Sequence, residues 1–262
     1  MQIMFFSVSL IASIIGAICG IGGGVIIKPA LDATGTMGVS TISFLSGCTV
    51  LAMALISVLK KIKNNEKEID IKIGTPLAIG GAIGGILGKE IFGITYCIFS
   101  SENTVGMIQS ILLAGITFAT LIYILNEKKI KTYEVENIIA CFMIGIFLGV
   151  ISSFLGIGGG PINIVILSFF FSMSTKKAAA NSLYIILFSQ ITSLLSTVAH
   201  NNIPSFQWNI LILMVLGGLI GGTLGNKVNK KISARGVDIL FSILMIFIIV
   251  INIYNSFKFY LA

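Results

Sequence analysis

The sequence predicts an all-α membrane protein: a polytopic bundle of transmembrane helices built from two inverted repeats, each with a glycine-broken segment. Three observations lead to this fold class. Of the 262 residues, 56% are hydrophobic and only 10% are charged, which is too little charge for the surface of a soluble domain. Several apolar runs reach the roughly 20 residues that cross the hydrocarbon core of a bilayer. Two glycine-rich patterns recur at nearly the same spacing along the chain.

The recurring patterns predict an internal duplication. GIGGG at Gly20–Gly24 returns at Gly156–Gly160, 136 positions later. GGAIGGILG at Gly80–Gly88 returns as GGLIGGTLG at Gly217–Gly225, 137 positions later, with five coinciding glycines. The chain therefore divides into a first transmembrane repeat, a cytoplasmic linker and a second transmembrane repeat, at 1–126, 127–136 and 137–262.

The expected elements follow the apolar runs in chain order. In each half an apolar span ends at the glycine run, a shorter apolar piece follows it, and three further spans are separated by polar loops. The strong spans are expected at 3–19, 39–60, 73–93, 105–125, 138–155, 178–199, 208–225 and 237–257. The shorter pieces are expected at 24–36 and 161–173.

Loop charge predicts the orientation of these spans. Loop 60–72 holds five lysines against three acids, loop 226–236 holds four basic residues and no acid, and linker 127–136 holds three lysines. Loops 94–104 and 200–209 contain neither Lys nor Arg. Because basic loops stay on the cytoplasmic side, the first three are expected inside and the last two outside.

Equivalent loops of the two halves thus fall on opposite sides, which predicts that the halves are inverted relative to each other. Inversion requires an odd number of crossings in each half. The short pieces after the glycines must therefore either complete a crossing or pair with the preceding segment as a broken span.

The GIGGG runs are expected to interrupt helices at membrane depth, where irregular backbone is tolerated only if protein buries it or if it lines a cavity. A new helix after the break has free N–H groups and a positive dipole end, and Pro161 suits its first turn. Such helix starts favour a small anion, and two inverted copies would bring two of them together. The alternative is that the glycines only let helices pack closely. We favour that alternative for Gly80–Gly88 and Gly217–Gly225, whose spacing makes one smooth helix face.

At these residues the sequence resembles the TauE/SafE family of sulfite exporters and related permeases. The resemblance covers the whole chain and is carried by the paired GIGGG runs, the glycine-rich third spans and AAANSLYII at 178–186. It implies an inner-membrane carrier for a small, often sulfur-containing, anion such as sulfite or an organosulfonate. The family motif usually reaches a proline a few residues after the glycines. Pro29 fits this pattern, whereas Pro161 follows the second run directly.

Polar groups inside a bilayer are costly and often functional. Lys28 could supply a positive charge for an anion; the alternative is that it reaches a lipid headgroup or pairs with Asp32. Amides and hydroxyls can donate hydrogen bonds to an oxyanion, although they also join helices to one another. The candidate substrate-binding residues are Gly22, Gly23, Gly24, Lys28, Ser46, Gly158, Gly159, Gly160, Asn163, Asn181 and Ser182.

The expected function is secondary transport of a small anion by alternating access between the two repeats. An anion channel and a membrane scaffold without a substrate are the alternatives. The sequence contains no ATP-binding motif and no catalytic set such as HExxH, so an enzyme is not expected. The cysteines lack CxxC spacing and His200 stands alone in an outer loop, so neither a metal nor a cofactor is expected.

The expected partners are the anion and the lipid bilayer, and a homo-oligomer remains open. Nucleic acid is not an expected partner, because the net charge of +7 sits in short loops between spans. The first thirty residues lack a basic start and match a later segment, so a cleaved signal peptide is not expected. A single Arg beside many Lys, Ile and Asn suggests an AT-rich bacterial genome, and hence a multi-pass protein of a bacterial inner (cytoplasmic) membrane.

Overall fold

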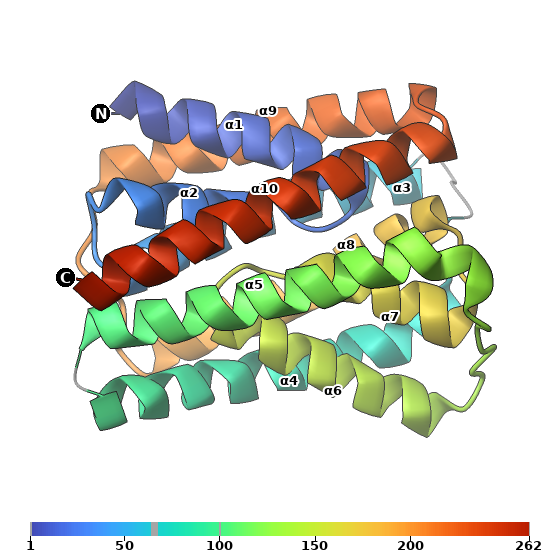
Figure 1. The fold of residues 1–262 in the computed structure, drawn as a ribbon, viewed down its shortest axis with the longest axis horizontal. Coiled ribbons are helices and arrows are strands. Elements are labelled where there is room, and N and C mark those ends of the chain that lie inside the picture. The colour runs from blue at the N-terminus through green and yellow to red at the C-terminus, as the bar shows by residue number, and fades with distance from the viewer. Residues whose placement is uncertain (1, 64–67, 100, 262) are drawn as a thin grey trace.

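The computed structural model describes residues 2–63, 68–99 and 101–261, apart from the side chain of Lys128. Residues 64–67 of the predicted basic loop 60–72 lie outside this part. Within the described residues the chain forms ten α-helices, one 3₁₀ helix and no strand (Figure 1). They are α1 (Gln2–Cys19), α2 (Gly24–Thr34), α3 (Val39–Lys63), α4 (Ile71–Phe99), α5 (Glu102–Asn126), η1 (Glu127–Lys129), α6 (Ile138–Phe154), α7 (Pro161–Phe171), α8 (Thr175–Ala199), α9 (Trp208–Lys231) and α10 (Ala234–Leu261). The all-helical prediction is confirmed, and each expected segment has its helix.

Seven of these helices are long and apolar enough to cross a membrane: α1, α3, α4, α5, α8, α9 and α10. Helix α6 was expected among the strong spans, but its 17 residues place it with the shorter apolar helices. Helices α2 and α7 have 11 residues each. At about 1.5 Å per residue they reach roughly 16 Å, about half of a hydrocarbon core. They therefore cannot complete a crossing.

Helix α2 instead folds back beside α1 as a hairpin. A Cβ atom placed on Gly23, directly before α2, would lie 3.2 Å from Ser13 Oγ in α1, and the two helices are in contact. The end of α2 lies beside the end of α10, where Lys258 Nζ donates a hydrogen bond of 2.9 Å to the carbonyl of Ala33. The hairpin therefore enters and leaves at the end of the bundle that carries both chain termini (Figure 1). We call this the terminal end.

Helices α6 and α7 form a second hairpin at the opposite end. The segment before α6 runs beside the end of α7, since the N–H of Tyr133 donates to the carbonyl of Phe169 (2.7 Å) and that of Val135 to Phe170 (2.9 Å). The end of α3, the start of α4 and the connections α5–α6 and α9–α10 lie at this end (Figure 1), and each of them belongs to a lysine-rich loop or adjoins one. We call it the basic end. Three long helices then remain in each half: α3, α4 and α5, and α8, α9 and α10.

Glycines bring the helices of different halves into backbone contact. A Cβ atom on Gly84 of α4 would collide with the carbonyl of Ile146 in α6. One on Gly221 of α9 would lie 2.7 Å from the carbonyl of Leu10 in α1. Small residues allow such close approach in membranes. The close-packing interpretation of the two longer glycine patterns is confirmed.

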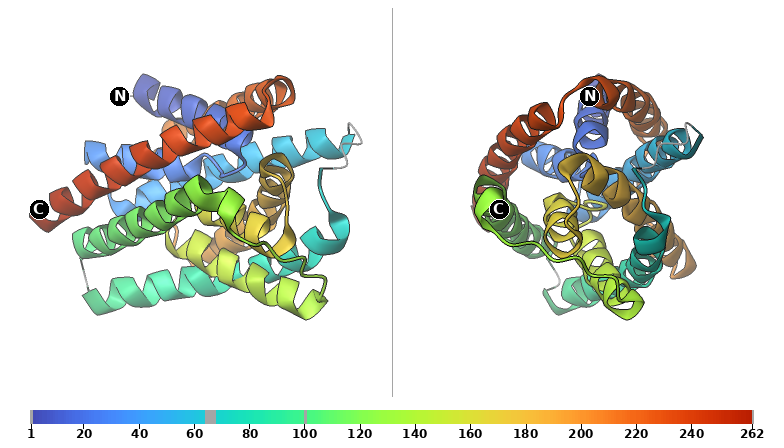
Figure 2. Two further views of the ribbon diagram at one scale, coloured as in Figure 1. Left: turned by 45° about the vertical axis from the view of Figure 1, so that its right-hand side comes forward. Right: turned by 90° about the vertical axis from the view of Figure 1, so that its right-hand side faces the viewer.

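The centre of the bundle is formed by α3 and α8, which run antiparallel. Gly47 of α3 faces Leu194 of α8, and Val50 of α3 packs in one buried cluster with Ile186 of α8. The end-on view shows α8 crossing the interior while α10 lies at the periphery (Figure 2). Both glycine turns lie against this central pair of helices.

Replacing Gly84 with Val is expected to destabilise the protein, because the added side chain has no space against α6. Overpacking of this kind costs about 1–3 kcal/mol. The matched control is Gly93→Val in the same helix, where nothing lies within 4 Å of an added Cβ atom. The thermal unfolding midpoint in detergent, followed by fluorescence of Trp208, should fall for the first variant and stay near wild type for the second. Equal midpoints would contradict the α4–α6 contact.

Candidate functional site

The two glycine runs form turns with closely similar backbones at the tips of the hairpins. The equivalent positions have left-handed φ angles: Gly20 +73°, Gly22 +73°, Gly156 +65° and Gly158 +69°. The turns differ one residue later, since Gly23 has an ordinary helical φ of −63° and Gly159 has a φ of +117°. Pro29 lies inside α2, whereas Pro161 is the first residue of α7. This difference in the position of the proline is thus accompanied by only a local change in the turn.

The two turns contact each other in the interior. A Cβ atom on Gly22 would lie 3.3 Å from the carbonyl oxygen of Gly158. One on Gly24 would collide with the carbonyl of Ile157. Side chains at these positions would hold the hairpins apart, so the absence of side chains permits the contact.

Polar side chains from four helices approach the second turn. A Cβ atom on Gly156 would lie 2.7 Å from Ser43 Oγ and 3.5 Å from Lys28 Cε. A Cβ atom on Gly158 would lie 3.1 Å from Gln190 Cδ, and one on Gly159 would lie 3.4 Å from Asn163 Nδ2. These residues come from α3, α2, α8 and α7. Asn163 also donates a hydrogen bond of 3.3 Å to Ser182 Oγ, and its own side-chain oxygen has no partner.

A small polar cavity of about 20 Å³ borders this turn at Gly156. The hydroxyls of Ser43 and Ser153 in its lining are buried and have no hydrogen-bond partner. An unpartnered buried hydroxyl costs about 1–3 kcal/mol, so these groups are poised to bind a water or a ligand. The polar lining residues are Ser43, Lys89, Ser153, Gln190, Ser193 and Thr197.

A much larger vestibule of about 850 Å³ opens at the terminal end. It lies between the start of α3 and the ends of α4 and α8, and its lining shares Lys89 and Thr197 with the polar cavity. Lys89 Nζ lies 4.9 Å from the centroid of the Phe92 ring, and His200 Nε2 lies 3.6 Å from Glu90 Oε1. Lys89 therefore lines both the vestibule and the polar cavity at the second turn.

A pocket of about 360 Å³ lies at the basic end. The helices that line it, α9 and α3, are the repeat counterparts of α4 and α8, whose ends line the vestibule. This pocket is lined by the ends of α3 and α9, including Asn226, which lies 137 positions after Lys89. Asn226 is 5% exposed, and neither polar atom of its amide has a partner. The basic residues around it are Lys60, Lys61, Lys63, Lys227 and Lys230.

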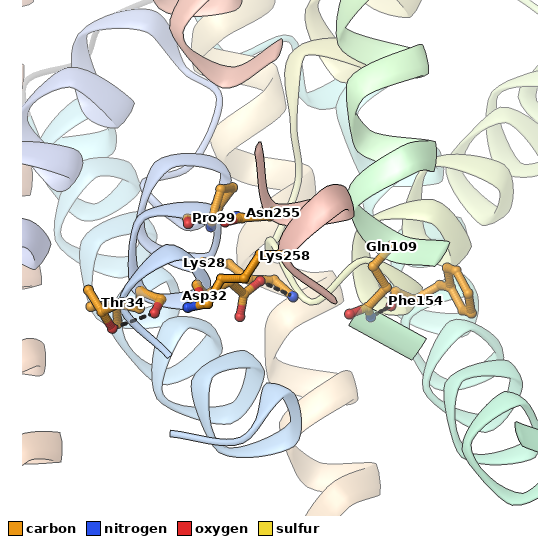
Figure 3. A network of polar contacts seen from close by, with 9 residues as sticks. Lys28, Pro29, Asp32, Thr34, Gln109, Phe154, Asn255 and Lys258 are labelled. Carbon is orange, nitrogen blue, oxygen red and sulfur yellow. Dashed lines mark hydrogen bonds and ion pairs between the residues drawn. The ribbon is translucent and has the colours of Figure 1, made fainter. Parts of the chain in front are cut away.

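Lys28 forms a buried ion pair beside the second turn (Figure 3). Its Nζ lies 2.7 Å from Asp32 Oδ2, and both side chains are 3% exposed. The other carboxylate oxygen, Asp32 Oδ1, has no partner. Two residues of α10 bind carbonyls of α2: Asn255 donates to Pro29 (2.8 Å), and Lys258 donates to Asp32 and Ala33. The expected alternative of pairing with Asp32 is confirmed, and it places the pair against Gly156.

The structure brings together most of the residues singled out in the sequence. Lys28, Asn163 and Ser182 lie with the second turn, and Ser46 is fully buried in α3 with an unpartnered hydroxyl. The glycines lie in the two turns or begin the helices after them: Gly22, Gly23, Gly24, Gly158, Gly159 and Gly160.

Asn181 is placed differently. Its amide donates to the carbonyls of Glu68 (2.9 Å) and Lys177 (2.8 Å) and accepts from the N–H of Asp70 (3.0 Å). It ties α8 to the segment before α4, which leaves it no donor for an anion. Beside it, partial burial alone would raise the pKa of Asp70, but hydrogen bonds from Lys177 and from the N–H of Ile73 hold that pKa below its ordinary value.

Six polar residues of the cavity lining are absent from the candidates selected from the sequence: Ser43, Lys89, Ser153, Gln190, Ser193 and Thr197. A sequence signal existed for two groups of them. Lys89 directly follows the repeated glycine pattern, and Asn226 follows it in the second half. Gln190, Ser193 and Thr197 recur at three- and four-residue spacing, which places them on one face of α8.

Replacing Ser43 with Ala is expected to weaken anion binding or transport by about ten-fold or more, because a hydrogen bond to a charged group contributes about 1.5–3 kcal/mol. Ser57→Ala is the matched control, since Ser57 is another fully buried, unpartnered serine of the same helix outside the cavity lining. Initial rates of anion uptake into proteoliposomes would compare the two. An equal effect of both changes would argue against the cavity.

Comparison with known proteins identifies the family. The sequence profile described as "Sulfite exporter TauE/SafE" matches residues 5–251. The chain is 26% identical to the "Probable membrane transporter protein YunE" of Bacillus subtilis (strain 168), covering 91% of this chain and 92% of that protein. It is 29% identical to the "Probable membrane transporter protein MJ0441" of Methanocaldococcus jannaschii, covering 90% and 89%. No solved structure matches it significantly. The chain belongs to the sulfite exporter TauE/SafE family of membrane transporters.

Proposed function

We propose that this protein is a secondary transporter that moves a small, sulfur-containing anion, such as sulfite or a sulfonate, across a bacterial cytoplasmic membrane. The observation that carries the proposal is the polar cavity at the second glycine turn, whose lining shares Lys89 and Thr197 with the vestibule. The serine hydroxyls, the amide and the lysine of its lining, with Lys28 beside Gly156, are suited to an oxyanion. The family description supports sulfur as the central atom of the substrate.

The mechanism proposed is alternating access between two inverted repeats, 1–126 and 137–262. Three features support the inversion: the hairpins enter from opposite ends, α3 and α8 run antiparallel, and each hairpin packs on the other half through α1–α9 and α4–α6. The lysine-rich loops support a cytoplasmic location for the basic end. The vestibule at the terminal end then faces outward, and the pocket around Asn226 is the inner entrance that opens in the alternate state.

The size of the polar cavity favours a carrier over a channel. About 20 Å³ is room for roughly one water, whereas a sulfur oxyanion carries three or four oxygens around its sulfur. The anion can reach and leave the glycine turns only if the helices around them move. A channel would need a continuous path of the anion's width.

The proposal predicts saturable anion flux that depends on the second glycine turn. Purified protein in proteoliposomes would be tested with sulfite, sulfate, thiosulfate, a sulfonate and acetate in turn. Gly159→Val should reduce the initial rate at least about ten-fold, because Gly159 has a φ of +117° and an added Cβ atom would collide with Ile186. Gly115→Val is the control, since nothing lies within 4 Å of a Cβ atom there.

The outcomes separate the candidate functions. Saturable flux of one sulfur oxyanion, lost only in the Gly159 variant, supports the carrier. Conductance that never saturates would indicate a channel instead. Sealed vesicles that pass none of these anions would remove the sulfur-anion proposal and leave a scaffold role to be tested.

A further inference from the structure

The buried Lys28–Asp32 pair poses an electrostatic problem for an anion at the second turn. The Cε atom of Lys28 lies 3.5 Å from a Cβ atom placed on Gly156, and Lys28 Nζ is already hydrogen-bonded to Asp32 Oδ2 at 2.7 Å. An arriving anion would place a second negative charge beside the same ammonium. In a buried site this repulsion is not screened by water, and a displaced, unpaired carboxylate is itself costly.

Besides Lys28, one other full positive charge lies near Asp32 and attracts its carboxylate. Lys258 of α10 is the second nearby cation, and its Nζ is bound to the backbone carbonyls of Asp32 and Ala33. Within the described residues it makes no ion pair with the Asp32 carboxylate. Helix α5 contributes the neutral Gln109 and Ser110 to this region, and α10 contributes Asn252. The titratable groups on α1 and on the adjacent part of α3 are the thiols of Cys19 and Cys48.

The Lys28–Asp32 pair has no counterpart in the second half of the chain. The positions 137 residues later, at which α7 matches α2, are Val165 and Phe169. A device built on this pair is therefore present in the first half alone, whereas a glycine turn is present in both halves.

We propose that Asp32 couples anion binding to proton uptake: the anion takes over Lys28 only as Asp32 accepts one proton. This inference rests on the proposed anion transport and deepens it by naming the coupling ion. The proton moves from water to a carboxylate oxygen of Asp32, and no covalent bond changes elsewhere. For a monovalent anion the site is neutral before and after, with Lys28 balanced first by the carboxylate and then by the anion. Transport would then carry one proton with each anion.

The test is a count of protons bound per anion. The full-length protein in lipid nanodiscs would be titrated with methanesulfonate and with thiosulfate, whose charges stay constant between about pH 5.5 and about pH 8. Calorimetry in two buffers of different ionisation enthalpy gives the number of protons taken up. Wild type should take up one proton per anion, and its affinity should fall about ten-fold per pH unit over the upper part of this range.

Asp32→Asn should bind the anion without proton uptake and with an affinity that no longer depends on pH. Asp70→Asn is the matched control, because Asp70 also pairs with a lysine, Lys177 at 3.0 Å, but at the basic end. It should keep the proton uptake of wild type. Infrared difference spectra of the unmodified protein give a second reading: anion addition should produce a protonated-carboxyl band, and this reading stands even if the Asp32 variant fails to fold.

Anion binding without proton uptake in wild type, or uptake that survives in Asp32→Asn, would overturn the coupling and leave the proposed transport intact. Absence of the carboxyl band would also overturn it. Failure of every sulfur anion to bind would remove the proposed function itself, and the coupling would fall with it.

Discussion

Irregular backbone inside a membrane is stable only where other protein atoms enclose it, and the contact between the two glycine turns meets this requirement. Each turn interrupts a helix, and each is covered by the other turn and by the central helices α3 and α8. The glycine-mediated contacts α1–α9 and α4–α6 hold the hairpins at the depth where their tips meet. The polar cavity and the buried ion pair both lie beside the second of these turns, at Gly156. A side chain at Gly24 would remove it at its closest point.

Composition and repetition were enough to predict the helices, because apolar length and glycine spacing are properties of single segments. Hydropathy alone did not determine whether the short pieces cross or fold back, since both arrangements bury equally apolar residues. The packing of α2 on α10 decides it, and that contact joins residues more than two hundred positions apart. The direction in which a side chain points from its helix was the second property that the sequence did not predict. Asn181 and Lys89 both lie on apolar helices. The Asn181 amide is hydrogen-bonded to the backbone of the loop before α4, whereas Lys89 lines a cavity.

The two halves share a scaffold but not their chemistry. Helix order and most of the turn geometry recur, while the charged pair on α2 is replaced by Val165 and Phe169 on α7. Conversely, Asn163 on α7 has the apolar Ile26 at the matching position of α2. The repeated segments thus form the same backbone turns and helix ends in both halves. The single side chains that differ between the halves decide which ligand each turn can bind. This separation is consistent with one membrane fold carrying different substrates by exchange of a few residues.

The pairing of α1 with α9 has a consequence for how the protein is made. The ribosome completes α1 at Cys19 but does not reach the end of α9 until Lys231. At typical synthesis rates this interval is roughly 10 to 40 s. Throughout it, the first hairpin sits in the membrane before the glycines of α9 cover α1 and before the second glycine turn contacts the first. Correct assembly therefore depends on the insertion machinery or the lipid sheltering an unfinished half until its partner emerges, and neither half expressed alone carries the contacts that would finish it.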